Sequence, residues 1–434
     1  MRPSTNSRLA LGGVLFAVAA CSEPGKLAQE QTGPNPPLPA INQYLVPPMH
    51  VASPTPWGDK MPAVAPGLKV TAFATGMKNV RGLYTLPNGD VLAVEPKGPE
   101  EPVKRPKDIV VGFVQGFGHN KTKGANQITL LRDADGDGRA ETRSVFLDNL
   151  VSPFGIALVG GDLYVANTDA VVRYPYQTGQ TRITARGTIL TELPGGPINH
   201  HWTKSLTASP DGSKLYVGIG SNSNITENGM EAEKDRARIW EVDRATGAHR
   251  TYAHGLRNPN GLTFNPESGQ LWAVINERDE LGPDLVPDYL TSVRPRAFYG
   301  WPYSYWGQHV DPRVMPQRPD LVRKAVVPDY GLGSHVAPLG LVFYQGAALP
   351  AAYRGGAFVG EHGSWDRGKL NGYKVVWVPF ANGRPTGKAR DVVTGFIAPD
   401  GKALGRPVGL AVDRAGALLI ADDLGNVVWR VTGA

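Results

Sequence analysis

The chain has 434 residues, of which 53 are glycine and 38 are proline, together about a fifth of the sequence. Hydrophobic residues make up 41%, enough for a large core, and the excess of turn formers favours many tight connections over a helical bundle. The single cysteine excludes an internal disulfide framework and cysteine-based zinc or iron–sulfur sites, and the net charge of +6, without basic runs, argues against nucleic-acid binding.

The N-terminus has the pattern of an export signal. Arg2 and Arg8 flank the start of an apolar stretch, residues 9–20. This stretch is too short for a spanning helix, which needs about 20 residues, and fits a signal peptide. It ends in Val-Ala-Ala-Cys at Cys21, which resembles the lipobox of bacterial lipoproteins. We expect residues 1–20 to be removed and Cys21 to anchor the protein by lipid at the periplasmic face of the outer membrane. A cleaved signal with a chance cysteine is the alternative.

Residues 21–65 form a proline-rich stretch, with ten prolines between residues 22 and 62. Such composition is typical of an extended, semi-rigid spacer. We expect it to hold the folded body, residues 66–434, away from the lipid surface.

Within the body one pattern recurs: a glycine or polar residue, then leucine or isoleucine, a short run, a turn and an apolar strand. Its six anchors are Leu83, Ile156, Leu206, Leu262, Leu341 and Leu410. Turns such as Pro87-Asn88-Gly89 are typical of hairpins. The spacing of the anchors suits one four-stranded sheet per copy. The pattern predicts an all-β fold, a six-bladed β-propeller, with a large β-sandwich as the alternative.

Loops near the blade entrances carry the candidate chemistry. The segment Asn199-His200-His201-Trp202 offers a histidine that can act as a base near neutral pH. Arg257 and Asn258 offer a cation and an amide to an anionic or carbonyl-rich ligand. Arg367 and Arg406 lie on loops beside glycines, where a ligand can approach closely. The structural alternatives are a hydrogen-bonded histidine pair and arginines on surface turns.

Two acidic loops are candidate metal sites, because calcium prefers oxygen ligands. The first contains Asp133, Asp135 and Asp137 in the pattern that starts an EF-hand, but its twelfth position is Ser144 instead of glutamate. The second begins at Glu277 and runs to residue 284. Solvated, charged turns are the alternative for both loops.

Taken in order, His-His-Trp before the third copy, Leu-Arg-Asn-Pro before the fourth and Gly-Arg-Pro before the sixth resemble one family. This is the glucose/sorbosone dehydrogenase family of six-bladed sugar dehydrogenases, which use pyrroloquinoline quinone (PQQ) and calcium, and the sorbosone branch is the nearest in likeness. The resemblance covers about residues 66–434. It implies oxidation of an aldose or sugar aldehyde with hydride transfer to PQQ, a histidine base, and a cytochrome or quinone as electron acceptor.

Carried over by position, the resemblance implies that His201 is the base, with His200 as second choice. Arg257 then lies near the reacting quinone oxygens. Further cofactor contacts are implied for Asn258, Trp365, Arg367 and Arg406, and cofactor calcium for the loop that contains Glu277 and Asp279. Ser221 stands where soluble glucose dehydrogenases have an aspartate that supports the histidine.

Two other functions stay open at this point. A calcium-dependent lactonase would hold a metal at the channel by side-chain carboxylates and would not need PQQ. A non-catalytic binding propeller is favoured by Ser221, because a hydroxyl cannot stabilise an imidazolium as a carboxylate would.

Overall fold

The structure is a computed structural model of the chain and describes residues 25, 30–43, 49–100, 116, 118 and 122–434. Strands dominate this part of the chain. Its helical elements include the short α3 (Pro319–Val322) and the 3-10 turns η1 (Met230–Glu233) and η2 (Ala351–Tyr353). None of the helices described is long and apolar enough to cross a bilayer. The predicted signal peptide and Cys21 lie outside the described residues.

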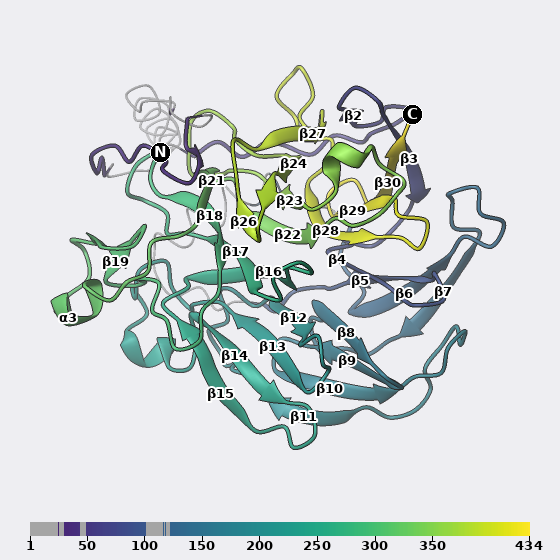
Figure 1. Cartoon of the computed structure of the whole chain (residues 1–434), viewed down its shortest axis with the longest axis horizontal. Coiled ribbons are helices and arrows are strands. Elements are labelled where there is room, and N and C mark those ends of the chain that lie inside the picture. The colour runs from purple at the N-terminus through teal and green to yellow at the C-terminus, as the bar shows by residue number, and fades with distance from the viewer. Residues whose placement is uncertain (1–24, 26–29, 44–48, 101–115, 117, 119–121) are drawn as a thin grey trace, which may run out of the picture.

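Six antiparallel sheets are arranged as blades around a central channel (Figure 1). The first blade comprises β4 (Gly82–Thr85), β5 (Val91–Glu95), β6 (Gln127–Arg132) and β7 (Thr142–Leu147). The second comprises β8 (Gly155–Val159), β9 (Asp162–Ala166), β10 (Ala170–Pro175) and β11 (Thr188–Glu192). The third comprises β12 (Lys204–Ala208), β13 (Lys214–Ile219), β14 (Arg238–Asp243) and β15 (His249–His254).

The next two blades each gain a fifth strand from the N-terminal part of the chain. The fourth blade comprises β16 (Asn258–Phe264), β17 (Leu271–Asn276), β18 (Pro287–Ser292), β21 (Tyr330–Ser334) and β1 (Thr32–Gly33). The fifth comprises β22 (Pro338–Phe343), β23 (Ala357–Glu361), β24 (Lys374–Val378), β27 (Arg390–Thr394) and β2 (Ala63–Val64). Their connections contain the small hairpins β19 (Ser304–Tyr305) with β20 (His309–Val310), and β25 (Phe380–Ala381) with β26 (Arg384–Pro385).

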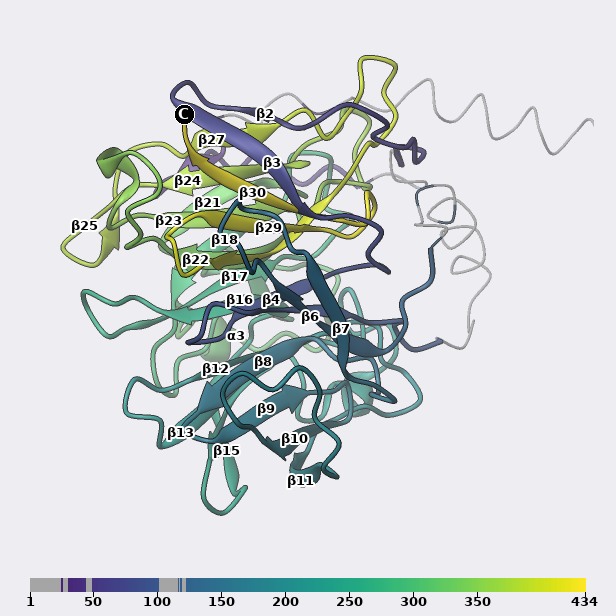
Figure 2. The same cartoon turned by 90° about the vertical axis from the view of Figure 1, so that its right-hand side faces the viewer.

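The sixth blade closes the ring, because it combines strands from both ends of the propeller sequence. It comprises β28 (Pro407–Val412), β29 (Leu418–Asp422), β30 (Val427–Gly433) and β3 (Leu68–Ala74). The strand β3, which precedes the first blade in the chain, lies antiparallel to β30 (Figure 2). The predicted all-β, six-bladed propeller is therefore confirmed.

Blade stacking buries both faces of the middle strands. The sequences of β5 and β29 are Val-Leu-Ala-Val-Glu and Leu-Leu-Ile-Ala-Asp, and every residue of both strands is buried. Because neighbouring blades cover both faces, such strands are continuous apolar runs instead of alternating ones. The core consists of apolar clusters between blades, as where Leu92 of the first blade and Leu163 of the second share one cluster.

The channel wall is built from the first strand of each blade. These strands are β4, β8, β12, β16, β22 and β28, and they carry the six predicted anchors. The glycine before the anchor allows neighbouring blades to approach closely. A Cβ on Gly340 would stand 2.1 Å from the carbonyl oxygen of Val408, and one on Gly155 would stand 2.4 Å from the backbone nitrogen of Leu206. The repeated glycine is therefore a packing requirement at these positions.

Parts of the proline-rich stretch 21–65, which we expected to be a spacer, pack onto the blades. Its strands β1 and β2 pair with two blades. Gln31 is fully buried, and its amide donates to the carbonyl of Asp284 at 2.6 Å. Trp57 is 7% exposed and packs edge-on against Phe396 and Trp429. Composition predicts extension, but it does not show the contacts that a few buried side chains make. The described parts of this stretch belong to the folded body.

Candidate functional site

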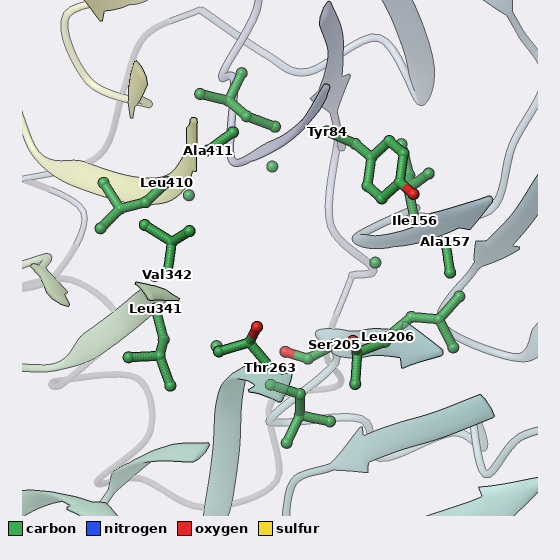
Figure 3. A pocket seen from close by; sticks show the side chains of 18 of the residues that line it. Tyr84, Ile156, Ala157, Ser205, Leu206, Thr263, Leu341, Val342, Leu410 and Ala411 are labelled. Atoms are coloured by element: carbon green, nitrogen blue, oxygen red, sulfur yellow. The ribbon is translucent and has the colours of Figure 1, made fainter. Parts of the chain in front are cut away.

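The channel opens into a cavity of about 630 Å³ at the end where the first strands of the blades begin. We call it the polar cavity. Its lining includes His200, His201, His362, Arg81, Arg406, Lys97, Lys123, Trp202, Trp365, Asn258 and Asp423. Further along the same strands, a second cavity of about 580 Å³ is lined mainly by apolar side chains such as Ile156, Leu206 and Leu410 (Figure 3). The candidate chemistry is therefore concentrated at one end of the channel.

His201 lies just before β12, and the loop after β13 fixes its ring. Its Nδ1 is 2.8 Å from the carbonyl oxygen of Ser221 and 3.1 Å from the hydroxyl, which itself donates to the carbonyl of Ser223. Nδ1 therefore carries the proton, and Nε2 keeps its lone pair. Burial, together with Arg257 and His200, lowers the pKa of His201 well below its ordinary value. The ring is neutral at pH 7 and able to accept a proton.

A buried arginine, which the sequence analysis did not identify, fixes the backbone around His201. The guanidinium of Arg236 donates to the carbonyls of His201 (3.1 Å), Gly220 (3.0 Å) and Pro194 (2.6 Å). One side chain thus connects the segment that carries the histidine with the loop that orients it. No sequence pattern marks this set, because a carbonyl acceptor places no constraint on residue type.

Another part of the cavity wall holds a histidine–carboxylate–arginine group. Nε2 of His362 is 3.0 Å from Oδ2 of Asp423, and Nη1 of Arg81 is 3.0 Å from the same oxygen. Burial alone would raise the pKa of Asp423, but His362 and Arg81 lower it to about 2. The carboxylate is ionised and is engaged by two neighbours. His362 lies in the same loop as the predicted residues Trp365 and Arg367, but no role was predicted for it.

Several polar atoms of the cavity wall are buried without a partner among the described residues. They are Nε of Arg81, Nε of Arg406 and Oδ1 of Asn258. Buried polar groups in folded proteins are normally hydrogen-bonded, so these atoms are available to a bound molecule. Lys97 and Lys123 add positive charge to the lining. This arrangement suits an anionic ligand with several acceptor oxygens.

Four of the residues predicted for catalysis or cofactor binding line the polar cavity, namely His201, Asn258, Trp365 and Arg406. Arg257 and Arg367 do not. Arg257 is buried behind the wall, with Nη1 2.6 Å from the carbonyl of Glu277 and Nη2 3.0 Å from Asp279. Arg367 is buried and pairs with Asp284 at 2.9 Å. Their direct cofactor contacts find no support in this geometry, because both side chains bind the loop after β17.

The first predicted metal loop is the exposed tip of the β6–β7 hairpin. One carboxylate oxygen from each of Asp133, Asp135, Asp137 and Glu141 lies within 4.8 Å of the others. Asp133 also accepts the backbone N–H of Gly136 at 2.7 Å, which shapes the turn. Glu141 was not among the predicted residues. Calcium at this loop stays a prediction.

The second predicted metal loop contributes to a buried group whose other members were not predicted. Potential ligand atoms of Asp279, His335 and Asp366 lie within 4.8 Å of one another. Glu277 is not a member, and burial raises the pKa of its carboxyl to about 7. His335 and Asp366 follow β21 and β23, so only the folded blades bring them to Asp279. No spacing in the sequence marks the group.

Comparison with known proteins gives a consistent family and fold. A family described as TrAA12-like matches residues 119–287 and 321–434. The PQQ-dependent pyranose dehydrogenase of Coprinopsis cinerea is 23% identical over 73% of this chain, which is 44% of its own length. The chain thus spans less than half of that relative.

Solved structures share the fold. The holo form of the pyranose dehydrogenase PQQ domain from Coprinopsis cinerea is 20% identical, covers 88% of this chain and 100% of its own, and superposes with a TM-score of 0.69. The calcium structure of a Trichoderma reesei family AA12 enzyme is 20% identical, covers 89% and 99%, and also has a TM-score of 0.69. The resemblance to PQQ-dependent sugar dehydrogenases is confirmed at family level, without distinction of a sorbosone branch. The chain belongs to the TrAA12-like family.

Proposed function

We propose that this protein is a PQQ-dependent dehydrogenase of an aldose or sugar aldehyde, and that PQQ binds in the polar cavity. The observation that carries the proposal is the combination of unpartnered, buried guanidinium nitrogens of Arg81 and Arg406 with a neutral, oriented His201. Membership in a family whose relatives include a PQQ-dependent pyranose dehydrogenase supports it.

The residues of the cavity fit the chemistry of PQQ, which is a flat, fused-ring molecule with three carboxylates. Arg81, Arg406, Lys97 and Lys123 supply the positive charge that these carboxylates require. Charge-assisted hydrogen bonds from guanidinium to carboxylate are among the strongest in proteins. Trp365 adds an aromatic side chain to the lining, against which a flat ring can pack.

His201 performs the proton chemistry in this proposal. PQQ, when bound, supplies the two-electron acceptor. Nε2 of His201 would take the proton of a sugar hydroxyl. The carbon that bears this hydroxyl would give up its hydride to the acceptor and become a carbonyl. The carbonyl of Ser221 holds the ring through Nδ1 in the orientation that leaves Nε2 as the acceptor. Arg236 holds the segment of His201 and the loop of Ser221 together, because its guanidinium donates to the carbonyls of His201 and Gly220.

The lining of the cavity argues against a calcium-dependent lactonase. Such an enzyme holds its metal at the channel with side-chain carboxylates. Asp423 is the single carboxylate among the described lining residues, and it is already bound by His362 and Arg81. The experiment below distinguishes a dehydrogenase from a non-catalytic binding propeller.

Calorimetry with PQQ in the presence of Ca²⁺, followed by dye reduction with a panel of aldoses, tests the proposal. We expect one PQQ per chain, weaker binding for Arg406→Met, and unchanged binding for the exposed control Arg173→Met. Absence of PQQ binding by the wild type overturns the cofactor assignment. Binding without dye reduction by any sugar favours the binding propeller.

We also propose that the protein is exported, anchored by lipid at Cys21, and passes electrons to a cytochrome or quinone. The sequence of residues 1–21 supports the anchor. Mass spectrometry of the membrane fraction should find acylated Cys21 as the first residue, and an unmodified Cys21 contradicts the anchor.

A further inference from the structure

Behind the polar cavity lies a cluster that the proposed reaction does not use. We propose that Asp279, His335 and Asp366 form a binding site for one divalent transition-metal ion, which differs in its donor set from the calcium that the resemblance implies for the loop of Asp279. None of the three residues lines the polar cavity. They come from the loops after β17, β21 and β23, so an ion here would join the fourth and fifth blades.

The donor atoms are already close together and protected from water. One potential ligand atom from each residue lies within 4.8 Å of the other two. His335 is 6% exposed and Asp366 is 2% exposed. The side chain of Asp279 is 17% exposed.

An unpartnered oxygen gives an observation independent of the clustering. Oδ2 of Asp366 accepts the backbone N–H of Glu280 at 2.9 Å, whereas Oδ1 is buried and has no partner among the described residues. A buried carboxylate oxygen without a partner is costly, because it has lost its water without compensation. A metal ion bound by this carboxylate would supply the missing interaction.

The orientation of His335 is that of a metal-binding imidazole. Its Nε2 is 3.1 Å from the carbonyl oxygen of Gly282, which can only accept a hydrogen bond. Its Nδ1 is 3.3 Å from Oδ1 of Asp279. Histidines that bind metals commonly donate their other ring N–H to a backbone carbonyl, which fixes the ring. Nδ1 of His335 is therefore the ligand atom.

The charge around the group also favours a cation. Four carboxyl groups interact here, those of Glu277, Asp279, Asp288 and Asp366. Arg257, Arg278 and His335 are the cations that face them. A divalent ion that replaces the single proton on Nδ1 would add positive charge beside these carboxyl groups.

The donor set distinguishes this ion from calcium. Calcium takes six to eight oxygen ligands, whereas imidazole nitrogen suits transition metals such as Zn²⁺ and tolerates accompanying carboxylates. One nitrogen and two carboxylates leave at least one position for water or a backbone carbonyl. We use Zn²⁺ as the probe ion for this reason.

Calorimetry on chelator-treated protein without PQQ tests the site. We expect tight binding of Zn²⁺ that excess Ca²⁺ does not displace. His335→Gln and Asp366→Asn should each weaken it by more than about tenfold. The control Asp137→Asn alters the exposed acidic loop and should leave this binding intact. PQQ affinity is measured separately, so failure here is distinct from failure of the dehydrogenase proposal.

X-ray absorption on the Zn²⁺-loaded wild type covers the case in which the variants do not fold. We expect a nitrogen and oxygen shell with the scattering of one imidazole. No Zn²⁺ binding by the wild type, unchanged binding by folded variants, or a shell without imidazole would each overturn the proposal. The group would then be a metal-free network of an imidazolium and carboxylates.

Discussion

A histidine base must be neutral before proton transfer and must be held in one orientation during it. In His201 these two requirements are met by different neighbours. Burial and nearby cations keep the ring neutral, and the carbonyl of Ser221 orients it. A carbonyl orients the ring without adding negative charge, so the imidazolium is less stabilised than it would be beside aspartate. The proton accepted from substrate should therefore be released readily.

Replacing His201 by alanine should lower kcat for dye reduction by roughly 10²–10⁴, because the proton acceptor is lost. PQQ affinity, measured by calorimetry, should change little. His200→Ala is the matched comparison, since it lines the same cavity next to the proposed base. A larger loss of kcat for His200→Ala than for His201→Ala would assign the base to His200.

Glu361 should couple the stability of the protein to pH. Burial, opposed in part by Lys374, raises its pKa to about 8. The folded chain then holds a proton that the unfolded chain releases above about pH 4, so the free energy of unfolding falls as pH rises from about 4 through about 8. Glu361→Gln removes this dependence. In urea titrations it should match the wild type near pH 5 and exceed it at pH 9 by on the order of a few kcal/mol.

The exposed Glu192→Gln is the control for this measurement, and its stability should follow the wild type at every pH. If the free energy of unfolding of Glu361→Gln also changes in parallel with that of the wild type from pH 5 to pH 9, Glu361 does not have a raised pKa.

At the scale of elements, the first strand of each blade lies in the closest contact with its neighbours around the channel. The first strand of one blade packs against that of the next, and the glycine before the anchor leaves room for the neighbour's backbone. Replacing Gly340 by alanine should force β22 and β28 apart, because the Cβ would stand 2.1 Å from the carbonyl oxygen of Val408. We expect a loss of about 1–3 kcal/mol in urea unfolding.

Gly196→Ala is the control for that substitution, because a Cβ there meets no atom within 4 Å. It should leave the urea midpoint close to that of the wild type. Equal midpoints for Gly340→Ala and Gly196→Ala would show that the channel wall can relax to admit a methyl group.

The same strands explain why the fold could be predicted. A glycine or serine followed by leucine or isoleucine, and hairpin turns, are local signals that recur along the chain, so the six anchors identify six first strands without any long-range information. The site was predictable only where its residues lie near a repeat, as His201 and Arg406 do. Asp423 and His335 carry no such mark, because their partners lie far from them in the sequence. Asp423 meets Arg81 and His362, and His335 meets Asp279 and Gly282, only in the folded blades.

At the scale of the whole molecule, both ends of the described chain hold the ring together. Strand β3 completes the sixth blade beside β30, and the preceding segment adds β1 and β2 to two other blades. Composition alone cannot distinguish such a bound segment from a free spacer, because proline suits any extended chain, whether it packs or not. The distinction lies in single buried side chains.

Trp57 is the clearest of these side chains. Its ring lies 5.6 Å from that of Phe396 and 5.2 Å from that of Trp429, and its indole N–H donates to Asp422 at 2.8 Å. Trp57→Ala should cost about 3–5 kcal/mol in urea unfolding, because it leaves a cavity in the core and an unpaired acceptor. The exposed Met61→Ala, four residues later, should cost little.

A chain that begins at residue 66 lacks β1, β2 and Trp57. A chain that begins at residue 49 lacks β1 and Gln31 but keeps β2 and Trp57, so it should unfold at a higher urea concentration. The order full chain, chain from 49, chain from 66 is the expected order of urea midpoints. Equal urea midpoints for the chain from residue 66 and for the full chain would show that the segment before residue 66 acts as a spacer and does not stabilise the blades. Thermal unfolding of the same three chains should give the same order, because the lost contacts stabilise the folded blades directly.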